Sequence, residues 1–193
     1  MTIRAVVFDF GGVLFDWNPQ HLYRKLIVDE HERQWFLDTI CTQAWNTEQD
    51  AGRPLAEATQ VLVDQFPHHK ALITAYYDRW HEMLRGPLPD GVAILKALYA
   101  ANMPLFGLTN WSAETFPYAR AHYPFLNCFR DIVVSGELKL IKPNPAIYDA
   151  SLSQVRAYLP DIQPGEVVFI DDVADNVDAA VALGWRGIHH VSA

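Results

Sequence analysis

Short apolar runs alternate with stretches of helical spacing through most of the chain. Runs rich in β-branched and aromatic residues predict strands at 3–8, 104–109, 131–135, 167–170 and 187–191. Between the later runs, apolar residues recur every three or four positions, which predicts helices at 89–101, 113–122, 145–158 and 175–183. Strands that alternate with helices indicate an α/β fold, here a Rossmann-like, doubly wound parallel sheet.

The stretch from Asp16 to about Gly86 departs from this alternation. It shows no good strand pattern, and apolar residues such as Ala58, Leu62 and Phe66 are spaced as on a helix. We therefore expect a small helical bundle inserted after the first strand, with 86–89 (Gly-Pro-Leu-Pro) as the linker that leaves it. This divides the chain into a core domain of residues 1–15 and 87–193 and a helical cap of residues 16–86.

Composition narrows the class of protein. The chain has 193 residues, half of them apolar, which is enough for one core and a small appendage. Its net charge of −8 disfavours nucleic-acid partners, which require neutralisation of phosphates. No apolar run approaches the ~20 residues of a membrane span, and no leader pattern precedes the first strand. Two well-separated cysteines, Cys41 and Cys128, suit a reducing compartment, so we expect a cytoplasmic location.

Two of the predicted strands end in acidic residues. Asp9 ends the first run and is followed by Phe10 and a Gly11-Gly12 turn, and Asp171-Asp172 ends the run near the C-terminus. The carboxyl edge of an open α/β sheet is where ligands bind, and a glycine turn exposes backbone N–H groups to an anion. Adjacent carboxylates repel one another and usually need a cation. The pattern predicts a metal-assisted site.

Two more polar elements fall at predicted strand ends: Thr109-Asn110, and Lys142 in the loop after the third strand. Lys139 competes with Lys142, but the Lys-Pro-Asn-Pro context favours Lys142. An acid, a hydroxyl, an ammonium and an acid pair suit phosphoryl transfer. A carboxylate can attack phosphorus, a cation shields the charge repulsion, and the other groups hold the phosphoryl oxygens.

Taken in this order, the four elements resemble the four motifs of the haloacid dehalogenase-like (HAD) hydrolase superfamily. The resemblance covers nearly the whole chain, including a cap after the first motif. It implies that Asp9 is the nucleophile. It implies that Mg²⁺ is held by Asp9, the carbonyl of Gly11 and Asp172, with Asp171 supporting the metal shell or Lys142.

The resemblance also implies how a substrate would be held. Thr109, Lys142 and the Gly11-Gly12 turn would bind the phosphoryl group, Asn110 would shape that pocket, and Asn176 would tie the last motif. At the entrance to the cap, Trp17 and Asn18 are the residues that we expect to contact the substrate. The first and last motifs look closest to the branch near epoxide-hydrolase N-terminal domains and bacterial α-glucose-1-phosphate phosphatases, which implies a sugar phosphate.

One position departs from the family pattern. Family phosphatases usually carry a second Asp two residues after the nucleophile, as general acid and base, and here that residue is Gly11. Losing such a group costs about 10² to 10⁴ in rate. The substrate could have a leaving group that needs little protonation, such as an anomeric or acyl phosphate, or a water or another side chain, such as Asp16, could supply the proton.

The missing Asp also leaves two other functions open. Dehalogenases of the superfamily lack that Asp and are metal-free, and Thr109-Asn110-Trp111-Ser112 resembles their sequences, so a 2-haloacid dehalogenase is one alternative. A non-catalytic HAD scaffold is the other. The expected function is Mg²⁺-dependent hydrolysis of a small phosphate monoester through an aspartyl-phosphate, because the adjacent acids fit a cation better.

Overall fold

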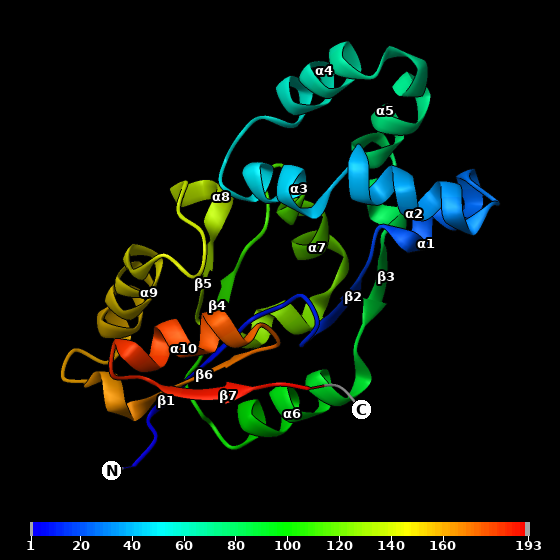
Figure 1. The fold of residues 1–193 in the computed structure, drawn as a ribbon. Coiled ribbons are helices and arrows are strands. Elements are labelled where there is room, and N and C mark those ends of the chain that lie inside the picture. The colour runs from blue at the N-terminus through cyan, green and yellow to red at the C-terminus, as the bar shows by residue number, and fades with distance from the viewer. Residues whose placement is uncertain (1, 192–193) are drawn as a thin grey trace.

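A five-stranded parallel sheet forms the centre of the molecule in the computed structural model, which describes residues 2–191 (Figure 1). The strand order is β5-β4-β1-β6-β7. The strands are β1 (Ala5–Phe8), β4 (Leu105–Thr109), β5 (Asp131–Val134), β6 (Val167–Asp171) and β7 (Arg186–His189). Each of the five predicted apolar runs therefore forms a strand, and the predicted doubly wound sheet is confirmed.

Helices cover both faces of this sheet, which is why its strands read as nearly continuous apolar runs. They are α6 (Pro89–Ala100), α7 (Phe116–His122), α9 (Pro145–Tyr158) and α10 (Ala174–Ala182). The side chains of β1 alternate between two cores: Val6 and Phe8 belong to the core that includes Leu95 of α6. Ala5 and Val7 belong to the core that includes α9. The central strand is thus buried on both faces, and this packing fixes the position of its C-terminal end, where Asp9 follows.

The predicted helical cap is present between the two segments of the core. Its helices are α1 (Gln20–Leu26), α2 (Glu30–Thr39), α3 (Gln43–Asp50), α4 (Leu55–Gln65) and α5 (Lys70–Asp78). Figure 1 shows α2 to α5 grouped away from the sheet, with α3 nearest to the core. Short elements complete the fold: α8 (Ser135–Leu138) and the 3-10 helices η1 (Pro67–His69), η2 (Trp80–Glu82), η3 (Pro124–Cys128) and η4 (Pro164–Glu166). The domain boundaries at 15/16 and 86/87 stay a prediction.

The expectation that no strand lies between Asp16 and Gly86 is wrong. Antiparallel strands β2 (Phe15–Trp17) and β3 (Leu84–Pro87) lead the chain into and out of the cap. The first two residues of the predicted linker 86–89 belong to β3, where Gly86 pairs with Asp16 and Pro87 with Phe15. Burial alternates along β3, as in a strand with one covered face. Gly86 has a φ of 135°, and a proline is tolerated at the edge of a two-stranded sheet, so the turn-like composition conceals a strand.

The helix predicted at 113–122 begins later, at Phe116, with Pro117 in its first turn. The preceding segment is held instead by Ser135, whose hydroxyl accepts a hydrogen bond from the backbone N–H of Trp111 at 2.8 Å.

No helix within residues 2–191 combines the length and the apolar character that crossing a bilayer requires.

Candidate active site

The two strand-end acids lie next to each other because β1 and β6 are neighbours. Phe8 pairs with Ile170, so Asp9 and Asp171 leave adjacent strands at the same edge. Strand order reverses here, since the chain fills one side of β1 first and then the other, and such a switch point forms the crevice where α/β proteins bind ligands. Thr109 ends β4 on the other side of β1 and is buried.

Lys142 joins the two acids. Its Nζ lies 2.8 Å from Oδ1 of Asp9 and 2.6 Å from Oδ2 of Asp171, and 5.4 Å from the centre of the Phe169 ring. Burial lowers the pKa of the ammonium, but the charges and hydrogen bonds of Asp9 and Asp171 outweigh burial and raise it. Lys142 therefore stays charged. It is Lys142, and not Lys139, that reaches the acids.

Asn110 fixes the loop that carries Lys142. The backbone N–H of Lys142 donates to Oδ1 of Asn110 at 2.8 Å, and Nδ2 of Asn110 donates to the Lys142 carbonyl at 3.0 Å. One amide side chain thus satisfies both polar backbone groups of the lysine. This explains how a residue at the end of β4 positions a charge that follows β5.

Asp171 and its neighbour differ in their surroundings. Asp171 is fully buried and accepts hydrogen bonds from Lys142, from the backbone N–H of Val173 at 2.8 Å and from Nδ2 of Asn176 at 3.1 Å. Asp172 is exposed and leans over Gly12. A Cβ on Gly12 would lie 2.1 Å from Oδ2 of Asp172, and the φ of Gly12 is +67°. Only glycine fits there while Asp172 keeps its place.

The carboxylates of Asp9, Asp171 and Asp172 each offer an oxygen within 4.8 Å of the others. Three negative charges face one ammonium. Burial raises the pKa of Asp9, and partial burial raises that of Asp172. In both cases the negative charge of Asp171 adds to the rise, as expected where carboxylates are in excess. A divalent cation would offset that excess. Hard oxygen donors are what Mg²⁺ prefers, so the donor set fits that ion.

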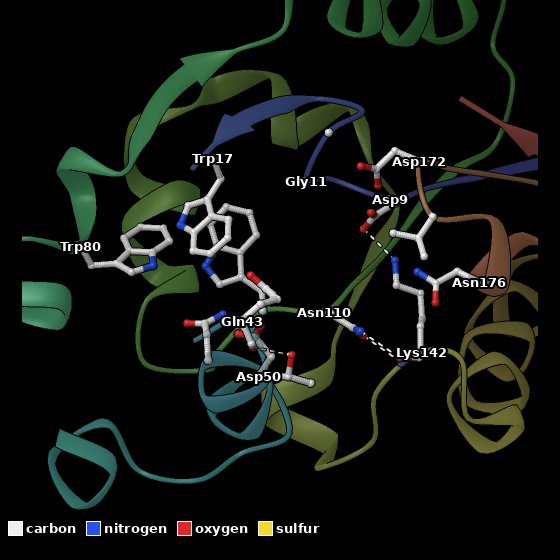
Figure 2. A pocket seen from close by; sticks show the side chains of 15 residues that line it. Asp9, Gly11, Trp17, Gln43, Asp50, Trp80, Asn110, Lys142, Asp172 and Asn176 are labelled. Atoms are coloured by element: carbon white, nitrogen blue, oxygen red, sulfur yellow. Dashed lines mark hydrogen bonds and ion pairs between the residues drawn. The ribbon is translucent and has the colours of Figure 1, made fainter. Parts of the chain in front are cut away.

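These side chains open into a cavity of about 310 Å³ between the core and the cap (Figure 2). Of the residues expected from the sequence, the cavity is lined by Asp9, Gly11, Gly12, Trp17, Asn110, Lys142, Asp172 and Asn176. Thr109 and Asp171 do not line it, because one is buried at the end of β4 and the other is enclosed by its partners. A volume of this size suits a small ligand.

Sequence reasoning missed one wall of this cavity. It is formed by two further tryptophans and one helix of the cap: Trp80, Trp111 and the α3 residues Gln43, Asn46, Thr47 and Asp50. Trp111 belongs to the motif 109–112, but that motif gave it no role. No motif or spacing marks the α3 residues, which only the approach of α3 to the core brings to the site. Most are ordinary polar residues of an amphipathic helix, so the sequence holds no signal that would have found them.

Asp50 is the acidic residue on this wall. Its Oδ2 accepts a hydrogen bond from Nδ2 of Asn46 at 3.0 Å, and its backbone carbonyl accepts one from the hydroxyl of Ser135 in the core. Burial raises the pKa of the Asp50 carboxyl to about 7, opposed by a hydrogen bond from the backbone N–H of Ser112. The carboxyl is therefore close to half protonated at neutral pH.

Asp16, which the sequence suggested as a source of protons, lies outside the cavity lining. Its Oδ1 is 2.9 Å from Nε2 of His21 and its Oδ2 is 3.8 Å from Arg85. The β2–β3 pair places Asp16 beside these two side chains at the neck of the cap, outside the cavity that contains Asp9. The suggestion of Asp16 is therefore not supported by its position.

Comparison with known proteins points in the same direction as this geometry. Sesquiterpene phosphatase astK of Aspergillus oryzae is 29% identical over 97% of this chain and 90% of its own length. The (S)-2-haloacid dehalogenase 1 of a Pseudomonas species is 24% identical over 96% of this chain and 83% of its own. A HAD family enzyme from Bacteroides thetaiotaomicron, solved as its magnesium complex, shares the fold with a TM-score of 0.71 at 21% identity, over 97% of this chain and 93% of that one. The model of the haloacid dehalogenase-like hydrolase family matches residues 3–184. The resemblance seen in the motifs is thereby confirmed, and the chain belongs to the haloacid dehalogenase-like hydrolases.

Proposed function

We propose that this chain is an Mg²⁺-dependent phosphatase that hydrolyses a small phosphate monoester through a phosphoryl group carried on Asp9. One observation supports this most directly. Asp9 faces the cavity with Lys142 at 2.8 Å and with Asp172 and the Gly12 turn beside it. A carboxylate and an ammonium converge where a phosphoryl group would sit, beside a glycine turn.

Each residue then has a distinct task. The Asp9 carboxylate attacks phosphorus, the bond from phosphorus to the alcohol oxygen breaks, and water later hydrolyses the acyl phosphate. Lys142 holds the phosphoryl oxygens, and the backbone N–H of Gly11 and the Thr109 hydroxyl are predicted to assist. The backbone N–H of Gly12, which the sequence also suggested for this task, donates instead to the Phe15 carbonyl at 3.0 Å. Asp171 orients Lys142 and supports the metal shell.

The cation would be held by Asp9, the carbonyl of Gly11 and Asp172. When bound, Mg²⁺ neutralises charge between the nucleophile and the phosphate. The acid cluster favours this function over a metal-free dehalogenase, because an uncharged haloacid carbon brings no dianion that calls for a cation. Asp9 also opens into the cavity, as a working nucleophile must, and this supports an enzyme over the non-catalytic scaffold.

Two classes of substrate should be tested first. Sugar phosphates follow from the motifs that look closest to the α-glucose-1-phosphate phosphatases. Isoprenyl phosphates are the second class, because three tryptophans (Trp17, Trp80 and Trp111) line the cavity and one relative is named a sesquiterpene phosphatase. Aromatic rings provide the apolar contact area that such a chain requires.

The test is phosphate release from sugar, isoprenyl, nucleotide and acyl phosphates, with and without Mg²⁺, with Asp9→Asn as the control. We expect release that needs Mg²⁺ and is abolished by the substitution. Asp9→Asn with undiminished activity would refute the mechanism. Halide release from 2-chloropropionate without Mg²⁺ would assign the chain to the dehalogenases, and silence with both kinds of substrate would favour a scaffold.

A further inference from the structure

The first motif of this chain lacks a proton donor, and the cavity shows where one could come from. Gly11 stands at the position of the missing acid and contributes no side chain. Among the described residues that line the cavity, four side chains can exchange a proton near neutral pH or carry a charge: Asp9, Lys142, Asp172 and Asp50. The first must be ionised to attack phosphorus, and the second is held charged by its two acids. Asp172 belongs to the cation site, which leaves one group without a task.

We propose that Asp50, on the cap, is the general acid and base of the phosphatase reaction. This inference rests on the proposed function, because it assigns the proton transfers of that same reaction. It makes the cap a part of the catalytic machinery and not only a cover.

The placement of Asp50 suits an in-line displacement. In phosphoryl transfer the attacking and leaving oxygens lie on opposite sides of phosphorus. Figure 2 shows Asp50 on the α3 side of the cavity and Asp9 on the other side, with Asn110 between them. A substrate whose phosphorus faces Asp9 therefore directs its leaving oxygen toward the cap, where Asp50 lies. The missing Asp would have approached from the core, so this donor reaches the same oxygen from the other domain.

The carboxyl is held in this position from two sides. Tyr77 donates its hydroxyl hydrogen to Oδ1 of Asn46 at 3.1 Å, which turns Nδ2 of Asn46 toward Asp50 at 3.0 Å. From the core, Ser135 binds the backbone carbonyl of Asp50 and the backbone N–H of Ser112 binds its carboxyl. Two phenols of the cap, Tyr76 and Tyr77, lie close enough to be affected by the charge of Asp50, and burial raises their pKa values, so both are neutral.

The proton balance closes without another reactant. In the first step Asp9 forms a bond to phosphorus, the bond to the ester oxygen breaks, and the leaving alkoxide takes the proton of the Asp50 carboxyl. In the second step the ionised Asp50 takes a proton from water as the water oxygen attacks phosphorus. The bond to Asp9 then breaks, inorganic phosphate leaves, and both carboxyl groups return to their starting states.

The test compares two esters in Asp50→Asn with Mg²⁺ present. p-Nitrophenolate leaves without a proton, whereas an alkyl alcohol does not, and kcat/KM reports the first step. We expect kcat/KM to fall at least 100-fold for an alkyl phosphate and less than about threefold for p-nitrophenyl phosphate. Because water activation is also lost, p-nitrophenyl phosphate should give a burst of one p-nitrophenolate per enzyme. Asp16→Asn, which changes an acid outside the cavity, should show neither effect.

An equal loss of kcat/KM for both esters, or no loss, would overturn the assignment of Asp50, because a structural role does not distinguish leaving groups. Wild-type protein provides a check that needs no folding of a variant. Its kcat/KM for the alkyl ester should decline above about pH 7 relative to that for the aryl ester, and parallel profiles would overturn the proposal. If the wild type hydrolyses neither ester, or if Asp9→Asn remains active, the proposed function itself is at fault.

Discussion

Nζ of Lys142 lies 2.6 Å from Oδ2 of Asp171, and neither side chain is more than 1% exposed. Removing one partner of a buried ion pair leaves an uncompensated charge in a medium of low polarity, which costs about 3–5 kcal/mol. Lys142→Met would leave two such charges, on Asp9 and Asp171. We expect its free energy of unfolding in urea to fall by about that amount and phosphate release to be lost. Lys139→Met, which removes a lysine that does not reach the acids, should change stability by no more than about 0.5 kcal/mol.

The loop that carries Lys142 should depend on both ends of the Asn110 amide. Asn110→Asp keeps the acceptor for the Lys142 N–H but replaces the donor to the Lys142 carbonyl with a second oxygen. The two oxygens would repel at about 3 Å, so we expect a loss of about 1–3 kcal/mol in urea unfolding and a lower kcat. Asn144→Asp is the matched control, because the side chain of Asn144 only accepts a hydrogen bond, from the N–H of Ala146. Comparable losses in both variants would contradict this explanation.

The sheet and the strand-end residues of the site could be predicted because local chemistry determines them. A strand buried on both faces must be apolar throughout, and its ligand edge follows from parallel pairing. Asp9, Asn110, Lys142 and Asp172 therefore lie where the motifs placed them. The ends of elements were harder to predict. β3 was not predicted because it contains Gly86 and Pro87, which are residues typical of turns.

The cap wall could not be predicted for a different reason. Asp50 reaches the cavity only because α3 lies against the core, where Ser135 and Ser112 contact it. Such contacts join residues far apart in the sequence and leave no periodicity behind. Asp16 is the converse case. Its place next to the first motif suggested a role in proton transfer, but its side chain pairs with His21 and lies outside the cavity lining, so its position does not support that role.

We expect Gly12 to be required for binding of the cation as well as for the turn. In Gly12→Ala the new methyl group would meet Oδ2 of Asp172 at 2.1 Å and the backbone would keep a φ of +67° that alanine disfavours. Displacing one carboxylate of the cation site should raise the half-saturating Mg²⁺ concentration about 10- to 100-fold. A Cβ on Gly11 meets nothing within 4 Å, so Gly11→Ala should leave that concentration within about threefold. Titration of both variants with Mg²⁺ measures the difference, and equal shifts would count against the steric cause.

The raised pKa of Asp50 also predicts how stability depends on pH. Burial raises this pKa from 3.8 to about 7. Between these values the folded protein keeps the proton and the unfolded chain releases it. The free energy of unfolding therefore falls as the pH rises. The contribution of Asp50 is therefore complete below about pH 4 and is lost by about pH 7, with an upper limit of about 4 kcal/mol.

Urea unfolding of the wild type and of Asp50→Asn across this range isolates the contribution, because other titrating groups affect both proteins equally. The variant should become more stable relative to the wild type as the pH rises from 4 to 7. A constant difference between the two would show that the folded-state pKa of Asp50 is ordinary.

The open space at Gly11 permits a restoration experiment. A side chain there would project into the cavity that contains Asp9, and its Cβ would meet no neighbour within 4 Å. Gly11→Asp therefore returns an acid to the place where family phosphatases carry one. If Asp50 performs the same proton transfers, this acid is redundant in the wild type and valuable without Asp50. We expect Gly11→Asp to raise kcat/KM for an alkyl phosphate at least tenfold in the Asp50→Asn background and less than threefold in the wild type. Such non-additivity is the mark of two groups that share one function. Gly11→Asn, whose side chain has the same size and no acidic proton, should raise kcat/KM in neither background. Equal gains from Gly11→Asp in both backgrounds would show that the two acids act independently.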